Sequence, residues 1–116
     1  MDAIDTQELI DFLTKGEVSE RLESYFKEVE RKKGKIFLSN YTLIELAYLL
    51  EYNFGVSRDL VAKSLRTIIE DRLFKVEGKR ELEEALKLYA EGMDLLSALK
   101  EVQLTKADAK RISIRK

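Results

Sequence analysis

The chain has 116 residues, 45% of them hydrophobic and 37% charged, with a formal net charge of -1, and this composition predicts one globular domain over residues 1–116. It contains no cysteine and no histidine, which excludes disulfides, thiolate chemistry and the usual histidine general base. If the protein is a catalyst, we expect it to use carboxylates and a hard cation such as Mg²⁺ or Mn²⁺.

The sequence also bears on where the protein acts. No apolar stretch approaches the roughly 20 residues that a membrane-spanning helix needs. The first residues, Met1–Asp5, are acidic and lack the basic-then-apolar order of a secretory signal. We therefore expect a cytoplasmic protein with no membrane segment.

Short apolar runs alternate with amphipathic segments along the whole chain. Glycines mark most of the predicted helix ends, and serines stand where helix N-caps are expected. The predicted elements, in chain order, are a strand at Ala3–Ile4, a helix ending before Gly16, a helix from about Ser19 to Lys33, a strand at Ile36–Leu38, a helix from Ser39 or Asn40 to Phe54, a helix from Ser57 to Glu70, a strand at Leu73–Val76, a helix from Arg80 to Ala90, a shorter helix from about Asp94 to Glu101, and strands at Val102–Thr105 and Ile112–Ile114.

This alternation predicts a small three-layer α/β fold. The sheet should be short and mostly parallel, with helices on both faces. An all-helical bundle is the alternative, because every predicted strand is short and could belong to a helix instead.

Three acidic residues follow predicted strands. Asp5 ends the first strand, Glu45 lies near the start of the helix after Ile36–Leu38, and Asp94 opens a helix after Gly92. Sites in open α/β sheets form outside the carboxyl ends of strands, so these acids could meet at one edge. Clustered carboxylates need a cation to stay ionised together. A divalent metal would supply that charge and lower the pKa of a bound water.

Each of these acids also has a simpler interpretation. Asp5 and Asp94 stand where a helix N-cap is expected. Glu45 lies in the otherwise uncharged run Tyr41–Leu50, which predicts a buried helix and a carboxylate that something must compensate. The alternative is that Glu45 faces solvent on an incompletely buried helix.

Five segments in order along most of the chain carry a family resemblance. They are Ile4–Thr6, Leu43–Leu50, Phe54–Arg58, Ala85–Tyr89 and Gly92–Leu99. As an ordered series they resemble a PIN domain, and in particular the VapC-type toxin ribonucleases of prokaryotic toxin–antitoxin pairs. The resemblance implies a small PIN-like fold.

The chain departs from the pattern of this family in its C-terminal part. Ser97 stands where the family usually has a catalytic aspartate, three residues after Asp94. The family's final Thr-x-Asp is also irregular, because Asp108 comes one residue late after Thr105. The stretch from residue 98 to 105 is shorter than the long helix that usually precedes the last strand.

The resemblance implies an endoribonuclease that hydrolyses single-stranded RNA with a water activated by Mg²⁺ or Mn²⁺. It implies Asp5, Glu45 and Asp94 as catalytic residues and metal ligands, and Asp108 as a weaker fourth ligand. The partners that it implies are RNA, an antitoxin protein and a second copy in a homodimer. It leaves open whether the change at position 97 reduces the activity.

Two other functions remain open. A catalytically degenerate PIN-like module could act through homodimerisation or by binding an antitoxin or another partner. Its surface would be formed by side chains of the predicted helices, namely Leu22, Tyr25, Phe26, Tyr48 and Tyr52. A small helical interaction domain would use the acids only as caps and surface residues.

Overall fold

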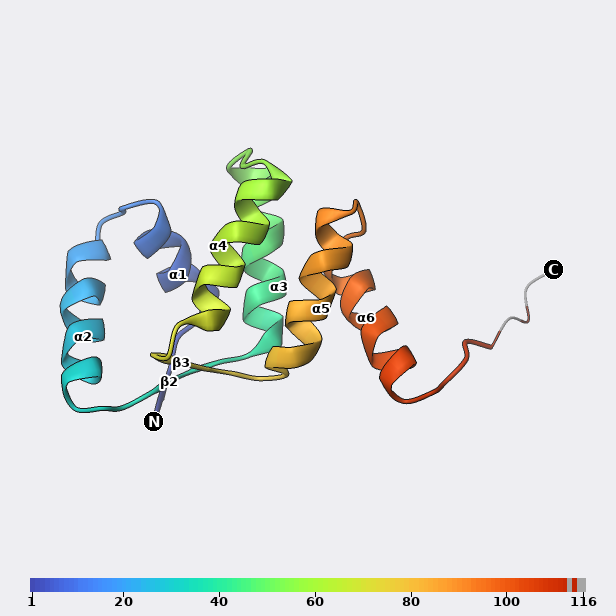
Figure 1. The fold of residues 1–116 in the computed structure, drawn as a ribbon. Coiled ribbons are helices and arrows are strands. Elements are labelled where there is room, and N and C mark those ends of the chain that lie inside the picture. Colours follow the sequence, from blue (N-terminus) through green and yellow to red (C-terminus); the bar gives the residue numbers. More distant parts are fainter. Residues whose placement is uncertain (113, 115–116) are drawn as a thin grey trace.

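The structure is a computed structural model and describes residues 1–112 and 114. The described part has three short strands that lie below a group of helices in the view of Figure 1. In chain order the elements are β1 (Asp2–Ala3), α1 (Thr6–Leu13), α2 (Ser19–Arg31), β2 (Ile36–Leu38), α3 (Asn40–Tyr48), the π-helical turn η1 (Leu49–Asn53), α4 (Arg58–Glu70), β3 (Phe74–Val76), α5 (Lys79–Ala90) and α6 (Leu95–Lys106).

The three strands form a parallel sheet in the order β1-β2-β3. This confirms the predicted α/β class and excludes the all-helical bundle. Each pair of strands is joined by helices, as parallel pairing requires.

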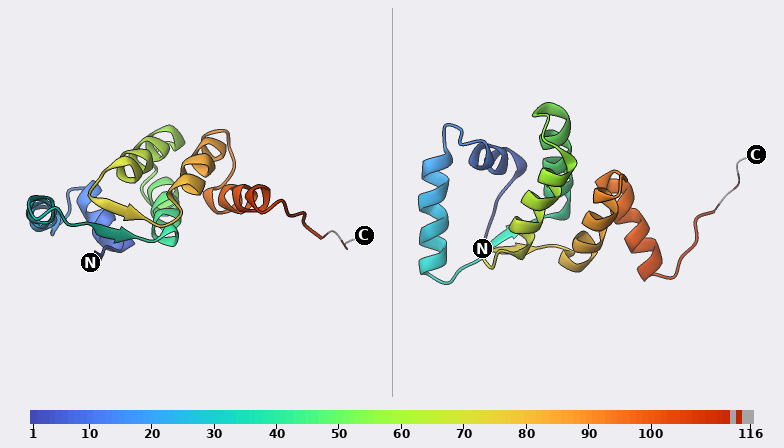
Figure 2. Two further views of the ribbon diagram at one scale, coloured as in Figure 1. Left: turned by 60° about the horizontal axis from the view of Figure 1, so that its bottom comes forward. Right: turned by 45° about the horizontal axis from the view of Figure 1, so that its top comes forward.

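The two faces of the sheet differ. Ile36 and Leu38 of β2 are buried, whereas Ala3 and Lys75, which are in register with the half-exposed Phe37, are exposed. Figure 1 and the right-hand view of Figure 2 show α1, α3 and α4 above the strands. Crossovers of one hand that advance in one direction place their helices on the same face. In the described residues the second face therefore lacks the helices that we expected there.

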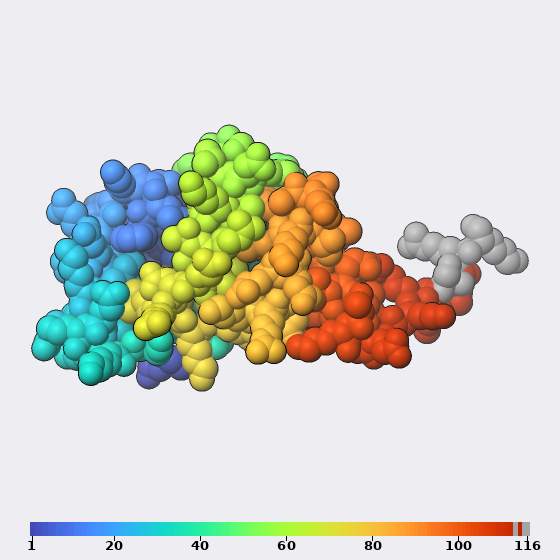
Figure 3. Space-filling model, in the orientation of Figure 1, coloured from blue at the N-terminus to red at the C-terminus, as the bar shows by residue number. Residues whose placement is uncertain are grey.

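The core lies between the covered face of the sheet and the helices. Fully buried side chains come from β2 and from the helices α1, α3, α4, α5 and α6, and each contributes about 1.5–3 kcal/mol relative to an exposed position. They include Leu9, Ile36, Leu38, Leu43, Leu46, Leu65, Ile69, Leu82, Leu86 and Leu95. Helix α5 packs against both α4 and α6, and Figure 3 shows α4 and α5 lying side by side across the molecule.

The helix predicted from Ser39 to Phe54 has two parts. Ser39 is its N-cap, and the Ser39 hydroxyl oxygen accepts a hydrogen bond from the amide of Tyr41 at 3.2 Å. After Tyr48 the helix widens into η1, where the Phe54 amide donates to the Leu49 carbonyl at 3.1 Å. Such π-helical turns recur at functional sites and displace the side chains that follow them.

One predicted strand is wrong. Residues 102–105 lie inside α6, which runs from Leu95 to Lys106. Ala98, Leu99 and Val102 are buried at helical spacing, and α6 packs on α5. Burial of this stripe therefore outweighs the strand preference of the valine and threonine. The strand predicted at Ile112–Ile114 includes a residue outside those that the structure describes.

Within residues 1–112 and 114, no helix combines the length and the hydropathy that crossing a bilayer requires.

Candidate active site

Asp5 lies between β1 and α1 and caps the helix. Its Oδ1 atom accepts a hydrogen bond from the Thr6 amide at 2.7 Å, and the Glu8 carboxylate accepts one from the Asp5 amide at 3.4 Å. This capping box satisfies amide groups that the first turn would otherwise leave without partners. The cap fixes the position of the Asp5 side chain, which is exposed to solvent.

Glu45 lies on α3 and is exposed, so the prediction of a buried carboxylate is wrong. Its neighbours Ile44 and Leu46 are both buried, because α3 turns them toward the core and leaves Glu45 on the outer side. The uncharged run around Glu45 indicates a helix that is buried on most, but not all, of its circumference.

Thr6 brings the two acids together. The Thr6 side chain is buried, and its hydroxyl donates a hydrogen bond to Glu45 Oε1, across 39 positions of the chain. The same hydroxyl oxygen lies 3.4 Å from Asp5 Oδ1. Asp5 and Glu45 also line one open surface depression, together with Tyr41 and Tyr48. We call Asp5 and Glu45 the acid pair, and Thr6 the bridging threonine.

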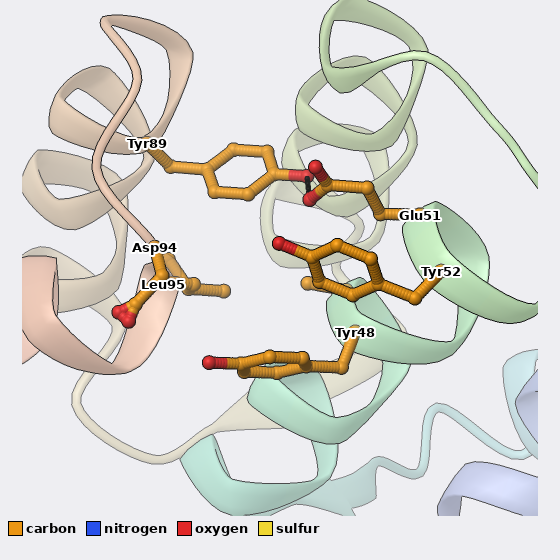
Figure 4. A pocket seen from close by; sticks show the side chains of 7 residues that line it. Tyr48, Glu51, Tyr52, Tyr89, Asp94 and Leu95 are labelled. Carbon is orange, nitrogen blue, oxygen red and sulfur yellow. Dashed lines mark hydrogen bonds between the residues drawn. The ribbon is translucent and has the colours of Figure 1, made fainter.

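Asp94 is separated from the acid pair by Tyr48, which lines the hollow of each. It is the N-cap of α6, and its carboxylate accepts hydrogen bonds from the Ser97 amide at 3.2 Å and from the Ser97 hydroxyl at 2.9 Å. Asp94 and Tyr48 line a second, smaller pocket, shown in Figure 4, where the Tyr48 hydroxyl points toward the carboxylate. Burial and the charge of Asp94 raise the pKa of Tyr48.

Asp108 is remote from these residues. It follows the C-terminal end of α6, has a backbone φ of 53° and is exposed. Asp94 and Asp108 therefore lie at opposite ends of a 12-residue helix, roughly 18 Å long. Among the residues that the structure describes, no group of three acids is close enough to hold a metal ion.

The charges around the acid pair match a hard cation. In residues 1–112 and 114, none of the ion pairs involves Asp5, Glu45 or Asp94. The oxygens Asp5 Oδ2 and Glu45 Oε2 accept no hydrogen bond from the described residues. Mg²⁺ binds through one or two carboxylates and keeps several waters. Two carboxylates with free oxygens are therefore a suitable donor set.

A second charged group was not anticipated from the sequence. Glu51 of η1, Arg58 of α4 and Tyr89 of α5 form a closed set of contacts that we call the clasp. The Tyr89 hydroxyl and Arg58 Nε donate hydrogen bonds to the two oxygens of Glu51, at 2.8 Å and 3.2 Å (Figure 4 shows the first). Burial raises the pKa of the Tyr89 hydroxyl, and the bond to Glu51 raises it further.

Arg58 also ties the α5–α6 turn to α4. Its Nη1 atom donates to the carbonyl of Tyr89 at 2.6 Å and to that of Met93 at 3.0 Å. The guanidinium carbon lies 4.2 Å from the centre of the Tyr89 ring, within the range of a cation–π interaction. Because Met93 precedes Asp94, these bonds also hold the N-cap of α6. The sequence signal that could have revealed the clasp is the opposite charges of Glu51 and Arg58 on either side of Gly55.

Together, the parallel α/β fold and the acids that follow its strands define a small PIN-like domain. A curated VapC ribonuclease of Aquifex aeolicus (strain VF5) is 36% identical over an alignment of 114 residues that covers 97% of this chain and 84% of that protein. No family model matches the chain. No solved structure matches it either. On the strength of this similarity, the chain belongs to the VapC ribonuclease family of PIN-domain toxins.

Proposed function

We propose that the protein is a toxin-type endoribonuclease that hydrolyses single-stranded RNA with Mg²⁺ or Mn²⁺. The observation that carries this proposal is the acid pair, because Asp5 and Glu45 meet at Thr6 with free oxygens and no cationic partner among the described residues. The relative of Aquifex aeolicus is named a ribonuclease, which supports the same activity here.

Asp5 and Glu45 would hold the cation in this mechanism. When bound, the metal supplies a water of lowered pKa and offsets the charge of the phosphodiester. The cap at α1 keeps the Asp5 carboxylate in place, and the Thr6 hydroxyl occupies Glu45 Oε1, so that Oε2 is the oxygen left for a ligand. The chain thus orients two carboxylates before the substrate arrives, which is the main contribution that a protein makes to such a site.

Asp94 would be the third acid of this face, acting on the cation through water. Its carboxylate is already bonded to Ser97, and Tyr48 lies between it and the acid pair. We therefore propose an activity lower than that of a site with a further aspartate at position 97. Asp108, which follows the C-terminal end of α6, would have no part in this site.

The family also motivates proposals about partners and location. An antitoxin that covers the acid pair would control the activity, and a homodimer is the proposed assembly. We propose that the protein acts in the cytoplasm, where its RNA substrate is found.

Calorimetric titration with Mn²⁺ tests the metal site directly. Binding should be measurable in the wild type and lost in Asp5→Asn and in Glu45→Gln, whereas Asp108→Asn should bind as the wild type does. Cleavage of a single-stranded RNA in Mg²⁺ should follow the same order. Cleavage that is equal in the wild type and in both acid variants would contradict the proposal.

A second candidate is a binding module without catalysis. It is favoured by one observation: no three acids approach each other in residues 1–112 and 114. A protein that binds an antitoxin but neither Mn²⁺ nor RNA would support it.

A further inference from the structure

The proposed metal ligand Glu45 lies within a row of tyrosines. Tyr41, Glu45 and Tyr48 follow one another at spacings of four and three residues on α3, which places them on one stripe of the helix. Tyr52 lies in η1, and its ring is next to that of Tyr48. The three tyrosine side chains are exposed, by 74% for Tyr41, 40% for Tyr48 and 63% for Tyr52. An acidic residue on this stripe therefore has an aromatic ring one turn before it and another one turn after it.

The tyrosine rings also line the two hollows of the candidate site. Tyr41 and Tyr48 line the depression that contains Asp5 and Glu45, and Tyr48 and Tyr52 line the pocket beside Asp94. The ring centres of Tyr48 and Tyr52 are 5.6 Å apart with a tilt of 34°, and Figure 4 shows the two rings one above the other. The α3 part of the stripe, from Tyr41 to Tyr48, extends over roughly 10 Å.

We propose that Tyr41, Tyr48 and Tyr52 form a nucleobase platform, on which bases of single-stranded RNA stack on both sides of the phosphate that the acid pair acts on. This inference rests on the proposed function and deepens it, because it assigns a recognition surface for the substrate. The base before the phosphate would lie at one end of the stripe and the bases after it at the other.

The chemistry of the stripe favours bases over phosphates. Asp5, Glu45 and Asp94 line the same two hollows as the rings, so a phosphate would be repelled there except where a cation held by Asp5 and Glu45 would offset the charge. Bases are neutral, and each offers a π-face that stacks on tyrosine regardless of sequence. In a duplex these faces are covered, so the platform selects single strands.

The test compares two oligonucleotides that share a backbone charge. Fluorescence anisotropy would measure binding of a labelled single-stranded DNA dodecamer of mixed sequence and of a dodecamer with abasic sites throughout. Tyr52→Leu should weaken binding of the base-bearing strand about tenfold, and the double variant Tyr48→Leu with Tyr52→Leu should weaken it further. Tyr52→Phe should bind as the wild type does, because the ring is retained.

The controls separate stacking from other effects. Phe54→Leu removes an exposed ring (52% exposed) outside the two hollows and should leave binding unchanged. Binding of the abasic strand should be the same in all variants. Circular dichroism melting would establish that each variant is folded, and light scattering would report the oligomeric state.

Three results would overturn the platform. The first is an equal loss of binding to the base-bearing and the abasic strand in Tyr52→Leu, and the second is no loss of binding to either strand. The third is a change from dimer to monomer that accounts for the weaker binding, in which case the stripe is an interface between copies. Failure of the proposed function is a different result: cleavage that persists in Asp5→Asn removes the nuclease site but leaves the binding comparison intact.

Discussion

Two glutamates on the same continuous helical segment have opposite surroundings. Glu51 lies in the clasp, where Arg58 and Tyr89 occupy both of its oxygens. Glu45 lies beside another carboxylate, and a threonine hydroxyl occupies one of its oxygens. The clasp compensates its charge within the protein and stabilises the fold. Within residues 1–112 and 114, no ion pair compensates the charge of the acid pair, and a cation-binding site requires this property.

The largest difference should appear when the two glutamates are exchanged for glutamine in parallel. Glu45→Gln should lower RNA cleavage at least about 100-fold, because it removes a charge that holds the cation, with little loss of stability. Glu51→Gln should keep most of the cleavage and lose about 2 kcal/mol in the free energy of unfolding. Cleavage assays and urea denaturation of both variants would check this, and the reverse pattern would contradict our assignment.

Replacing Arg58, the positively charged residue of the clasp, tests the structural role of the clasp. Arg58→Met leaves Glu51 without its ionic partner and frees two backbone carbonyls, and we expect a loss of about 3 kcal/mol in the free energy of unfolding. Arg66→Met is the matched control, because Arg66 is exposed on the same helix. A loss in urea denaturation that is the same for both variants would show that the clasp contributes nothing of its own.

The bridging hydroxyl can be removed with little change in shape. Thr6→Val should cost about 1 kcal/mol in the free energy of unfolding, because a buried hydrogen bond to a carboxylate is lost. The variant should also bind Mn²⁺ more weakly, because the two carboxylates are no longer held at one point. Thr6→Ser retains the hydroxyl and serves as the control. Thermal melts and Mn²⁺ titration would measure the two effects, and normal binding by Thr6→Val would refute the bridge.

The smallest effect is expected at high pH. The pKa of Tyr89 is raised in the folded protein, so the folded state holds this proton more tightly than the unfolded chain, whose tyrosine pKa is about 10. The stabilisation is complete below about pH 10 and is lost as the pH rises toward the folded pKa. Tyr89→Phe should lower stability by about 1 kcal/mol at neutral pH and flatten this alkaline loss. Denaturation curves from pH 7 to 11 would give the free energy of unfolding of the wild type and of Tyr89→Phe. If the Tyr89 proton were not involved, the two free energies would change with pH in parallel.

The prediction of the fold from sequence succeeded where local signals were strong. The strands at residues 36–38 and 74–76, the serine caps and the helix before Gly92 all have short-range signatures, and the structure contains them, with β3 beginning one residue later than predicted. The prediction failed at residues 102–105, where the choice between strand and helix depends on packing against α5. Nor did periodicity reveal the exposed side of α3, because one charged residue among apolar ones fits both interpretations.

By itself, the sequence determined which chemistry is open to this protein. With no cysteine and no histidine, carboxylates are the metal ligands that remain, and its order of motifs indicated the family. Only the tertiary structure decided which acids are neighbours. Asp5 and Glu45 meet because α1 packs on α3, and Glu51 is neutralised because α4 and α5 bring Arg58 and Tyr89 to it. Contacts between residues so far apart in the chain depend on how whole elements pack, and local sequence does not specify that packing.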